Sequence, residues 1–242
     1  MHKMKKIMIL LILLLVVALQ TIPTSVEARA GGGGGSSGGS GGSSGSHTSS
    51  HSSSSSNDPL SRIFGILTFV IVSSSSIIVM RVKITKYRYN ARKDFKDTDW
   101  NYKELVKRVE KTYFILQKAW TKNDIKLAKG YLTKELYENY KSKLEWMELG
   151  HKKNILKKIR LLNVYPISVS DEKGNKNDKV YMYIKGKMVD YTINTNTNEV
   201  IEGNGISKSF IEYWLFVKNR NGEWVLSKIY QYDELDVIPY YN

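Results

Sequence analysis

Acidic and tyrosine side chains are the residues of this chain best suited to acid–base chemistry. Asp190 and Tyr191 are adjacent in a stretch rich in Tyr, Val, Ile and Met, and they form the strongest catalytic candidate. Adjacent residues of a strand point to opposite faces, however, so only one of the two could face a pocket. Glu212 lies beside Tyr213 and Trp214 in a similar stretch, and the sequence leaves open whether it is buried. The favoured interpretation assigns no catalytic residue.

Metal and cofactor sites are not predicted either. The chain has no cysteine, which excludes disulfides, thiolate zinc sites and a cysteine nucleophile. His151 is the only histidine after residue 59, so a histidine triad or a histidine-rich metal site is not expected. Glu135 with Glu138 and Glu145 with Glu148 are spaced three apart, which is typical of a solvated helix face.

Basic residues form the sharpest functional feature. Residues 81–160 contain 23 Lys and Arg against 10 Asp and Glu, a net charge of +13, whereas residues 161–242 contain nine against eleven. A basic collar consists of Arg81, Lys83, Lys86, Arg88, Arg92 and Lys93, and a second basic patch consists of Lys152, Lys153, Lys157, Lys158 and Arg160. Each Lys or Arg near an anionic leaflet contributes about 1 kcal/mol. We expect the collar to bind anionic phospholipid, with a protein partner as an alternative and nucleic acid less favoured.

The collar follows a segment long enough to span a membrane. Leu60 to Met80 has 21 residues and one charge, Arg62, and a helix of that length reaches about 30 Å. Ser73 to Ser76 are its most polar part. Residues 1–30 are expected to form a signal peptide or signal anchor, with a small-x-small pattern at Ala28–Ala30, and residues 31–59 a flexible Gly/Ser-rich linker.

The distribution of basic residues predicts the orientation in the membrane. The loop between the two apolar segments contains one basic residue, Arg29, while the collar contains six. The positive-inside rule therefore places the collar and all that follows in the cytoplasm, with the Gly/Ser tract outside. We expect a cell-membrane protein that is single-pass after leader cleavage.

Residues 81–98 are interpreted as a basic juxtamembrane segment and residues 99–242 as one α+β domain. Thr98 or Asp99 is expected to cap a helix ending near Trp120, and Asp124 and Thr133 to cap two more, the last ending at Gly150. Strands are predicted at residues 155–169, 179–194, 206–217 and 224–232, the last two joined by a tight Asn221-Gly222 turn. The expected fold packs these three helices on one face of a four-stranded antiparallel sheet.

Several motifs in this region resemble those of one family. They are Ala119-Trp120, Asp124 and Leu132-Thr133, then Asp190-Tyr191 with Gly203, then Phe210 to Phe216, and finally Gly222 to Leu226 ahead of Ile229 and Gln231. Together they resemble the Tim44-like domain family, the C-terminal domain of the mitochondrial inner-membrane import-motor tether, which also occurs in bacterial membrane proteins. The resemblance covers residues 99–231.

The resemblance implies a cone-shaped domain of the nuclear-transport-factor-two-like type. It implies binding to membranes rich in anionic lipid and an apolar pocket. We expect this pocket to take an acyl chain, a peptide segment or a small molecule. Candidate lining residues are Trp120, Tyr131, Tyr183, Tyr191, Tyr213, Trp214 and Phe216. The leader, the Gly/Ser tract and the chain's own span depart from the mitochondrial tether, so its chaperone and translocase role is not carried over.

Three functions follow as hypotheses. The first is a membrane-anchored, non-catalytic binding module for anionic lipid or a protein partner. The second is a membrane tether for a ribosome or another nucleoprotein. The third is a pocket enzyme of the isomerase or hydrolase type, since cone folds include isomerases with a carboxylate base and a tyrosine.

Overall fold

The computed structural model describes the backbone of residues 59–171 and 178–239, and the side chains of residues 78–171 and 178–239. The signal segment and nearly all of the Gly/Ser-rich linker predicted from the sequence lie outside the described residues. The described chain belongs to two compact units, with the boundary between Val82 and Lys83. Each is considered by itself.

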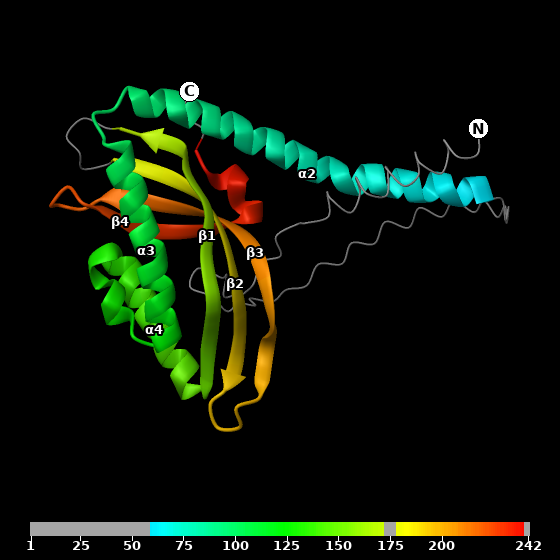
Figure 1. Ribbon diagram of the computed structural model, residues 1–242. Helices are drawn as coiled ribbons and strands as arrows, with labels where there is room; N and C mark the ends of the chain where they lie inside the picture. The colour runs from blue at the N-terminus through cyan, green and yellow to red at the C-terminus, as the bar shows by residue number, and fades with distance from the viewer. Residues whose placement is uncertain (1–58, 172–177, 240–242) are drawn as a thin grey trace, which may run out of the picture. The chain divides into compact units, whose positions relative to one another are not determined.

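The first described helix, α2, spans Pro59–Lys96 (Figure 1). The helical conformation predicted for Leu60 to Met80 is therefore confirmed, and the helix continues through the collar. Among the residues described with their side chains, no helix is long and apolar enough to cross a membrane. The side chains of residues 60–77 lie outside that set, so the membrane-spanning role of this segment stays a prediction.

Helix α3 spans Tyr102–Lys122, and its capping residue explains where it begins. The Asn101 side chain accepts hydrogen bonds from the backbone N–H groups of Lys103 and Glu104, at 3.0 and 3.3 Å. The sequence had predicted this cap at Thr98 or Asp99. Thr98 instead donates from its hydroxyl to the Phe95 carbonyl at 2.9 Å, and so closes the turn between α2 and α3.

The other two helical segments begin where the sequence predicted. The 3₁₀ helix η1 spans Ile125–Tyr131 and is capped by Asp124, and α4 spans Lys134–Leu149 and is capped by Thr133. In both cases the side-chain oxygen accepts a hydrogen bond from a backbone N–H in the first turn.

The sheet contains four antiparallel strands in the order β1-β2-β3-β4: β1 spans Lys152–Ser170, β2 Lys179–Asn194, β3 Val200–Lys218 and β4 Trp224–Gln231. This confirms the predicted four-stranded antiparallel sheet in an α+β fold. Gly222 has φ of +77° in the turn between β3 and β4, which explains the Asn-Gly sequence there.

One face of the sheet is covered by α3 and α4 (Figure 1). Trp120 of α3 and Trp214 and Phe216 of β3 are fully buried in the core between these layers. Helix α3 approaches β2 closely at Gly186, where a Cβ atom would clash with the Phe210 ring and the Tyr113 hydroxyl. A larger residue at position 186 would therefore require the Phe210 and Tyr113 side chains to move.

The other face carries the 3₁₀ helix η2, Tyr232–Val237, and is contacted by the part of α2 around Tyr87 and Arg88. The Tyr87 hydroxyl donates to the Ile238 carbonyl at 3.3 Å, and the Lys83 ammonium forms an ion pair with Asp236. The Ser168 hydroxyl of β1 donates to the Pro239 carbonyl at 2.7 Å. Helices were predicted on one face only, whereas helical segments contact both faces of the sheet.

Candidate functional site

The basic collar lies on a helix with a buried face and an exposed face. Its buried residues are spaced three or four apart, as one stripe of a helix requires: Ile84, Tyr87, Ala91 and Phe95. On the opposite face Lys86, Tyr89 and Lys93 are exposed at spacings of three and four. Tyr89 is 72% exposed and was not singled out from the sequence, although this spacing would have identified it.

The six collar residues have two kinds of surroundings. The Arg88 guanidinium carbon lies 4.3 Å from the centre of the Tyr165 ring, and Lys83 pairs with Asp236. These two contacts bind the helix to the folded domain. The other four side chains, Arg81, Lys86, Arg92 and Lys93, are exposed. Lys86, Arg92 and Lys93, which belong to the same compact unit, are called the basic face of α2 below, and Arg81 belongs to the other unit.

Arg88 contacts one end of a row of tyrosines on the same sheet face. Tyr165, Tyr183, Tyr213 and Tyr230 occupy paired positions on the four strands. The Tyr165 and Tyr183 rings are stacked with centroids 4.5 Å apart, and the Tyr213 hydroxyl donates to the Tyr232 carbonyl. Burial raises the pKa of Tyr213, as do nearby ionisable groups, of which Tyr232 has the largest effect.

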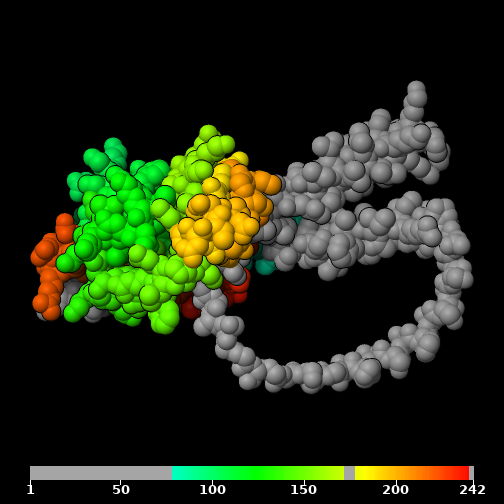
Figure 2. Space-filling view, turned by 90° about the horizontal axis from the view of Figure 1, so that it is seen from below, coloured from blue at the N-terminus to red at the C-terminus, as the bar shows by residue number. Residues whose placement is uncertain are grey.

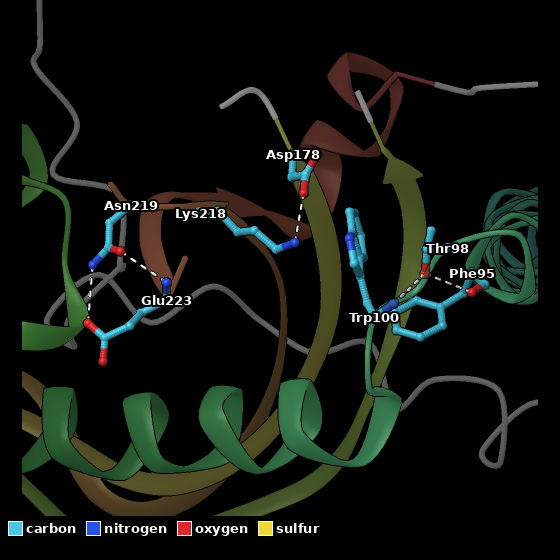
Figure 3. Close-up of polar contacts among 7 residues, drawn as sticks. All are labelled: Phe95, Thr98, Trp100, Asp178, Lys218, Asn219 and Glu223. Carbon is cyan, nitrogen blue, oxygen red and sulfur yellow. Dashed lines mark hydrogen bonds and ion pairs between the residues drawn. The ribbon is translucent and has the colours of Figure 1, made fainter. Parts of the chain in front are cut away.

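The corner between α2 and α3 is anchored to the ends of β2 and β3 (Figure 3). The Lys218 ammonium lies 2.8 Å from the Asp178 carboxylate, whose side chain is fully buried, and 4.9 Å from the centre of the Trp100 ring. The backbone N–H of Trp100 in turn donates to the Thr98 hydroxyl at 3.3 Å. These contacts hold the C-terminal end of α2 against the domain.

The second basic patch lies at the opposite end of β1. Lys152 and Lys153 begin the strand and are exposed, whereas Arg88 contacts the strand at Tyr165. At about 3.3 Å per residue, roughly 25 Å of strand separates Lys157 from Tyr165. Figure 2 views this end of the domain, where the ends of β2 and β3, in yellow and orange, lie beside α4 and β1. The collar and the second patch are therefore separate surfaces.

The members of the second patch also differ among themselves. Lys157 and Lys158 line a cleft of about 570 Å³ with Tyr191 of β2. Arg160 is exposed, and its carbonyl accepts a hydrogen bond from the Tyr113 hydroxyl at 3.2 Å.

The aromatic residues proposed to line a pocket are distributed over four places. Tyr183 and Tyr213 belong to the tyrosine row, Tyr191 lines the cleft beside Lys157, and Tyr131 lies 4.3 Å from the Arg108 guanidinium carbon. The remaining three, Trp120, Trp214 and Phe216, are in the core under α3 and α4. Strand alternation explains the separation, because it directs successive residues to opposite faces.

The two candidate carboxylates are buried on the helix-covered side of the sheet. Asp190 accepts a hydrogen bond from the Asn154 amide at 2.8 Å, and Glu212 accepts one from the Trp214 indole N–H at 2.9 Å. Asp190 and Tyr191 face opposite sides, as strand alternation predicted. Burial and the Glu212 carboxylate both raise the pKa of Tyr140, burial having the larger effect.

Catalytic and metal chemistry gain no further support from the described side chains. Neither Asp190 nor Glu212 lines the cleft beside Lys157 or the cleft of about 390 Å³ near Trp100. His151 is exposed after α4, and its carbonyl accepts a hydrogen bond from the Thr195 N–H. In the part of the chain that the structure describes, no three acidic or histidine side chains are grouped as metal ligands.

The family model described as "Tim44-like domain" matches residues 91–231. The chain belongs to the Tim44-like domain family. The match begins at Ala91, within the buried stripe of α2, and ends with β4. Comparison with curated proteins gives no match. Among solved structures, the intermembrane space region of the chloroplast protein ARC6 is similar to this chain, with 10% sequence identity and a TM-score of 0.41. The matched region covers 55% of this chain and 99% of the ARC6 chain.

Tim44-like domains are binding or tethering modules. The resemblance recognised in the sequence is thereby confirmed, together with the coarse functional class that it implied. The observed match begins eight residues before residue 99, where the resemblance was expected to start, and so includes the end of the collar helix.

Proposed function

We propose that this Tim44-like protein is a membrane-anchored, non-catalytic binding module whose basic face of α2 binds anionic phospholipid headgroups. One observation carries the proposal: the part of α2 that follows the predicted span buries one stripe in the domain and exposes Lys86, Arg92 and Lys93. A basic helix at this place in the chain suits the inner leaflet of the cell membrane, with the domain in the cytoplasm.

The electrostatic contribution should decline along the helix. Lys86 is six residues after Met80, or about 9 Å of helix rise, while Lys93 is about 20 Å along the helix. The potential of an anionic leaflet falls off within a Debye length, about 8 Å at physiological salt. Arg81 and Lys86 should therefore contribute more than Arg92 and Lys93. Tyr89, an exposed aromatic residue between them, suits the headgroup region.

Limited proteolysis can test the proposal. Full-length protein would be placed in nanodiscs of zwitterionic lipid or of lipid rich in phosphatidylglycerol, and trypsin cleavage after Lys86 would be timed. We expect slower cleavage with phosphatidylglycerol and recovery in high salt. Equal rates in both lipids would contradict headgroup binding. Cleavage after the exposed Lys153, at the other end of β1, provides the control.

A nucleoprotein tether is the second candidate, and one observation favours it. The exposed Lys152 and Lys153 lie at the end of β1 remote from α2, where an acidic partner could bind while the basic face contacts a membrane. Ribosome co-sedimentation of the full-length protein, lost when both lysines are changed to glutamate, would support the tether. Co-sedimentation that is absent from the start would end it.

No observation favours the enzyme hypothesis. Asp190 and Glu212 are buried and bound by neighbouring side chains of the same sheet, as expected of structural carboxylates. We therefore assign them to the core.

A further inference from the structure

A second ligand site lies at the end of the sheet remote from α2. The cleft of about 570 Å³ beside Lys157 has an apolar floor formed by Val189, Ile155, Ile193 and Val200 from three neighbouring strands. This floor belongs to the face opposite the core under α3 and α4, since the intervening Leu156 and Met188 belong to that core. A volume of this size suits a small ligand.

A β-bulge brings two lysines to the same cleft. In a regular strand Lys157 and Lys158 would point to opposite faces. The register of β1 against β2 shifts between Lys157 and Arg160, and Lys158 has φ of +53°, in the left-handed region that favours glycine. As a result both side chains line the cleft. Backbone strain of this kind at a non-glycine residue is common at binding sites, where bulges redirect a side chain.

The Lys157 ammonium is also held in position. It lies 5.6 Å from the centre of the Tyr191 ring, within range of a cation–π contact. The cleft therefore combines two neighbouring cations with a continuous apolar surface. A ligand that complements both has an anionic head and a hydrocarbon body.

The sheet itself argues against a peptide as the occupant. The floor is centred on β2, which is paired with β1 on one side and with β3 on the other. Its backbone groups are engaged in the sheet, so the floor presents side chains only. An extended peptide lying there could not pair its N–H and C=O groups with the sheet as an added strand does, whereas a hydrocarbon chain needs no such pairing.

We propose that this cleft binds a single-chain anionic amphiphile of the fatty-acid class, taken up as a monomer. The carboxylate lies between the Lys157 and Lys158 ammonium groups, and the chain covers Val189 and Ile193. The site goes beyond the proposed function, because it lies at the other end of β1 from the basic face of α2 and does not depend on it.

Photolabelling of the full-length protein in zwitterionic nanodiscs tests this site. The probe is a diazirine-bearing palmitate, with the corresponding fatty alcohol as the uncharged control and peptide mapping as the readout. We expect labelling of residues 189–193 and 200–205 that unlabelled oleate competes away and that the alcohol does not reproduce. Labelling confined to the exposed Trp146 and Leu149, or equal labelling by the alcohol, would overturn the proposal.

Two kinds of variant complete the test. Lys157→Gln and Lys158→Gln should each reduce labelling by roughly fivefold, the effect of one partly exposed ion pair. Gly205→Phe should abolish it without disturbing the fold, because Gly205 lines the cleft and a Cβ atom there meets nothing within 4 Å. Unchanged labelling in Gly205→Phe would overturn the proposal even if the lysine variants failed to fold. Lys86→Gln should leave labelling unchanged, which separates this site from the basic face of α2.

Discussion

The Arg88 guanidinium carbon lies 4.3 Å from the centre of the Tyr165 ring, so a residue of the basic collar stabilises the folded domain. The neighbouring Lys86 is exposed on the other side of the same helix. Two similar charges, two positions apart, thus have different roles. The basic segment that follows the predicted span is a helix of the domain as well as a candidate lipid-binding surface.

These different roles can be separated by matched substitutions. Arg88→Gln should lower the free energy of unfolding by about 1 kcal/mol, the size of a partly exposed cation–π contact, and should leave lipid dependence largely intact. Lys86→Gln should weaken the lipid dependence and leave the free energy of unfolding largely unchanged. Urea unfolding and trypsin protection in nanodiscs measure the two effects. Equal behaviour of the two variants in both assays would contradict the division.

The Asp178–Lys218 ion pair should be important for stability. Asp178 has a fully buried side chain and Lys218 is 12% exposed, so Asp178→Asn would leave the ammonium with little solvent compensation. We expect a loss of about 3 kcal/mol in the free energy of unfolding, measured by urea denaturation. The double variant with Lys218→Met is the control and should recover most of that loss. No recovery would show that the pair is not the cause.

Stability should fall at alkaline pH because of the tyrosines. Burial raises the pKa of Tyr213 and Tyr140 above the usual 10.0. Above pH 10 the unfolded chain loses protons that the folded chain retains, so the free energy of unfolding decreases as pH rises from there toward the folded pKa. Each such tyrosine contributes a slope of about 1.4 kcal/mol per pH unit.

Urea unfolding at a series of pH values measures that slope. Tyr213→Phe should remove one tyrosine's share of it. Tyr89→Phe, at a residue that is 72% exposed, is the control and should leave the slope unchanged. A slope that is the same in all three proteins would contradict the assignment to Tyr213.

The strain at Lys158 predicts an unusual stability order. Lys158→Gly removes the left-handed penalty and Lys158→Ala retains it, while both remove the ammonium. The glycine variant should be more stable than the alanine variant by about 1 kcal/mol in urea unfolding, although both should show weaker palmitate labelling. An alanine variant as stable as the glycine variant would show that the bulge is unstrained.

The sequence was sufficient for the elements with strong local signals. Asp124 and Thr133 cap helices because their side chains bind backbone N–H groups within a few residues, and Asn221-Gly222 forms a turn because glycine tolerates positive φ. Local rules of this kind need no knowledge of the rest of the fold.

The second covered face of the sheet depended on contacts distant in sequence. Tyr87 binds Ile238 across 151 positions, and Lys83 pairs with Asp236. From the sequence, residues 81–98 were instead expected to lie outside the domain. The sequence also did not predict that two adjacent lysines line one cleft, because a bulge breaks the alternation on which strand predictions depend.

A label at Tyr89 tests the central claim most directly. The chain has no cysteine, so Tyr89→Cys gives a unique attachment point on the exposed face of α2, and Leu149→Cys gives a matched control at the other end of the domain. A spin label at each position, in full-length protein in nanodiscs, reports accessibility to oxygen and to a water-soluble relaxation agent. Phosphatidylglycerol should move the label at position 89 toward the lipid, salt or Lys86→Gln should reverse the shift, and the label at 149 should not respond. Accessibility at position 89 that is the same in zwitterionic and anionic nanodiscs would contradict headgroup binding by this helix.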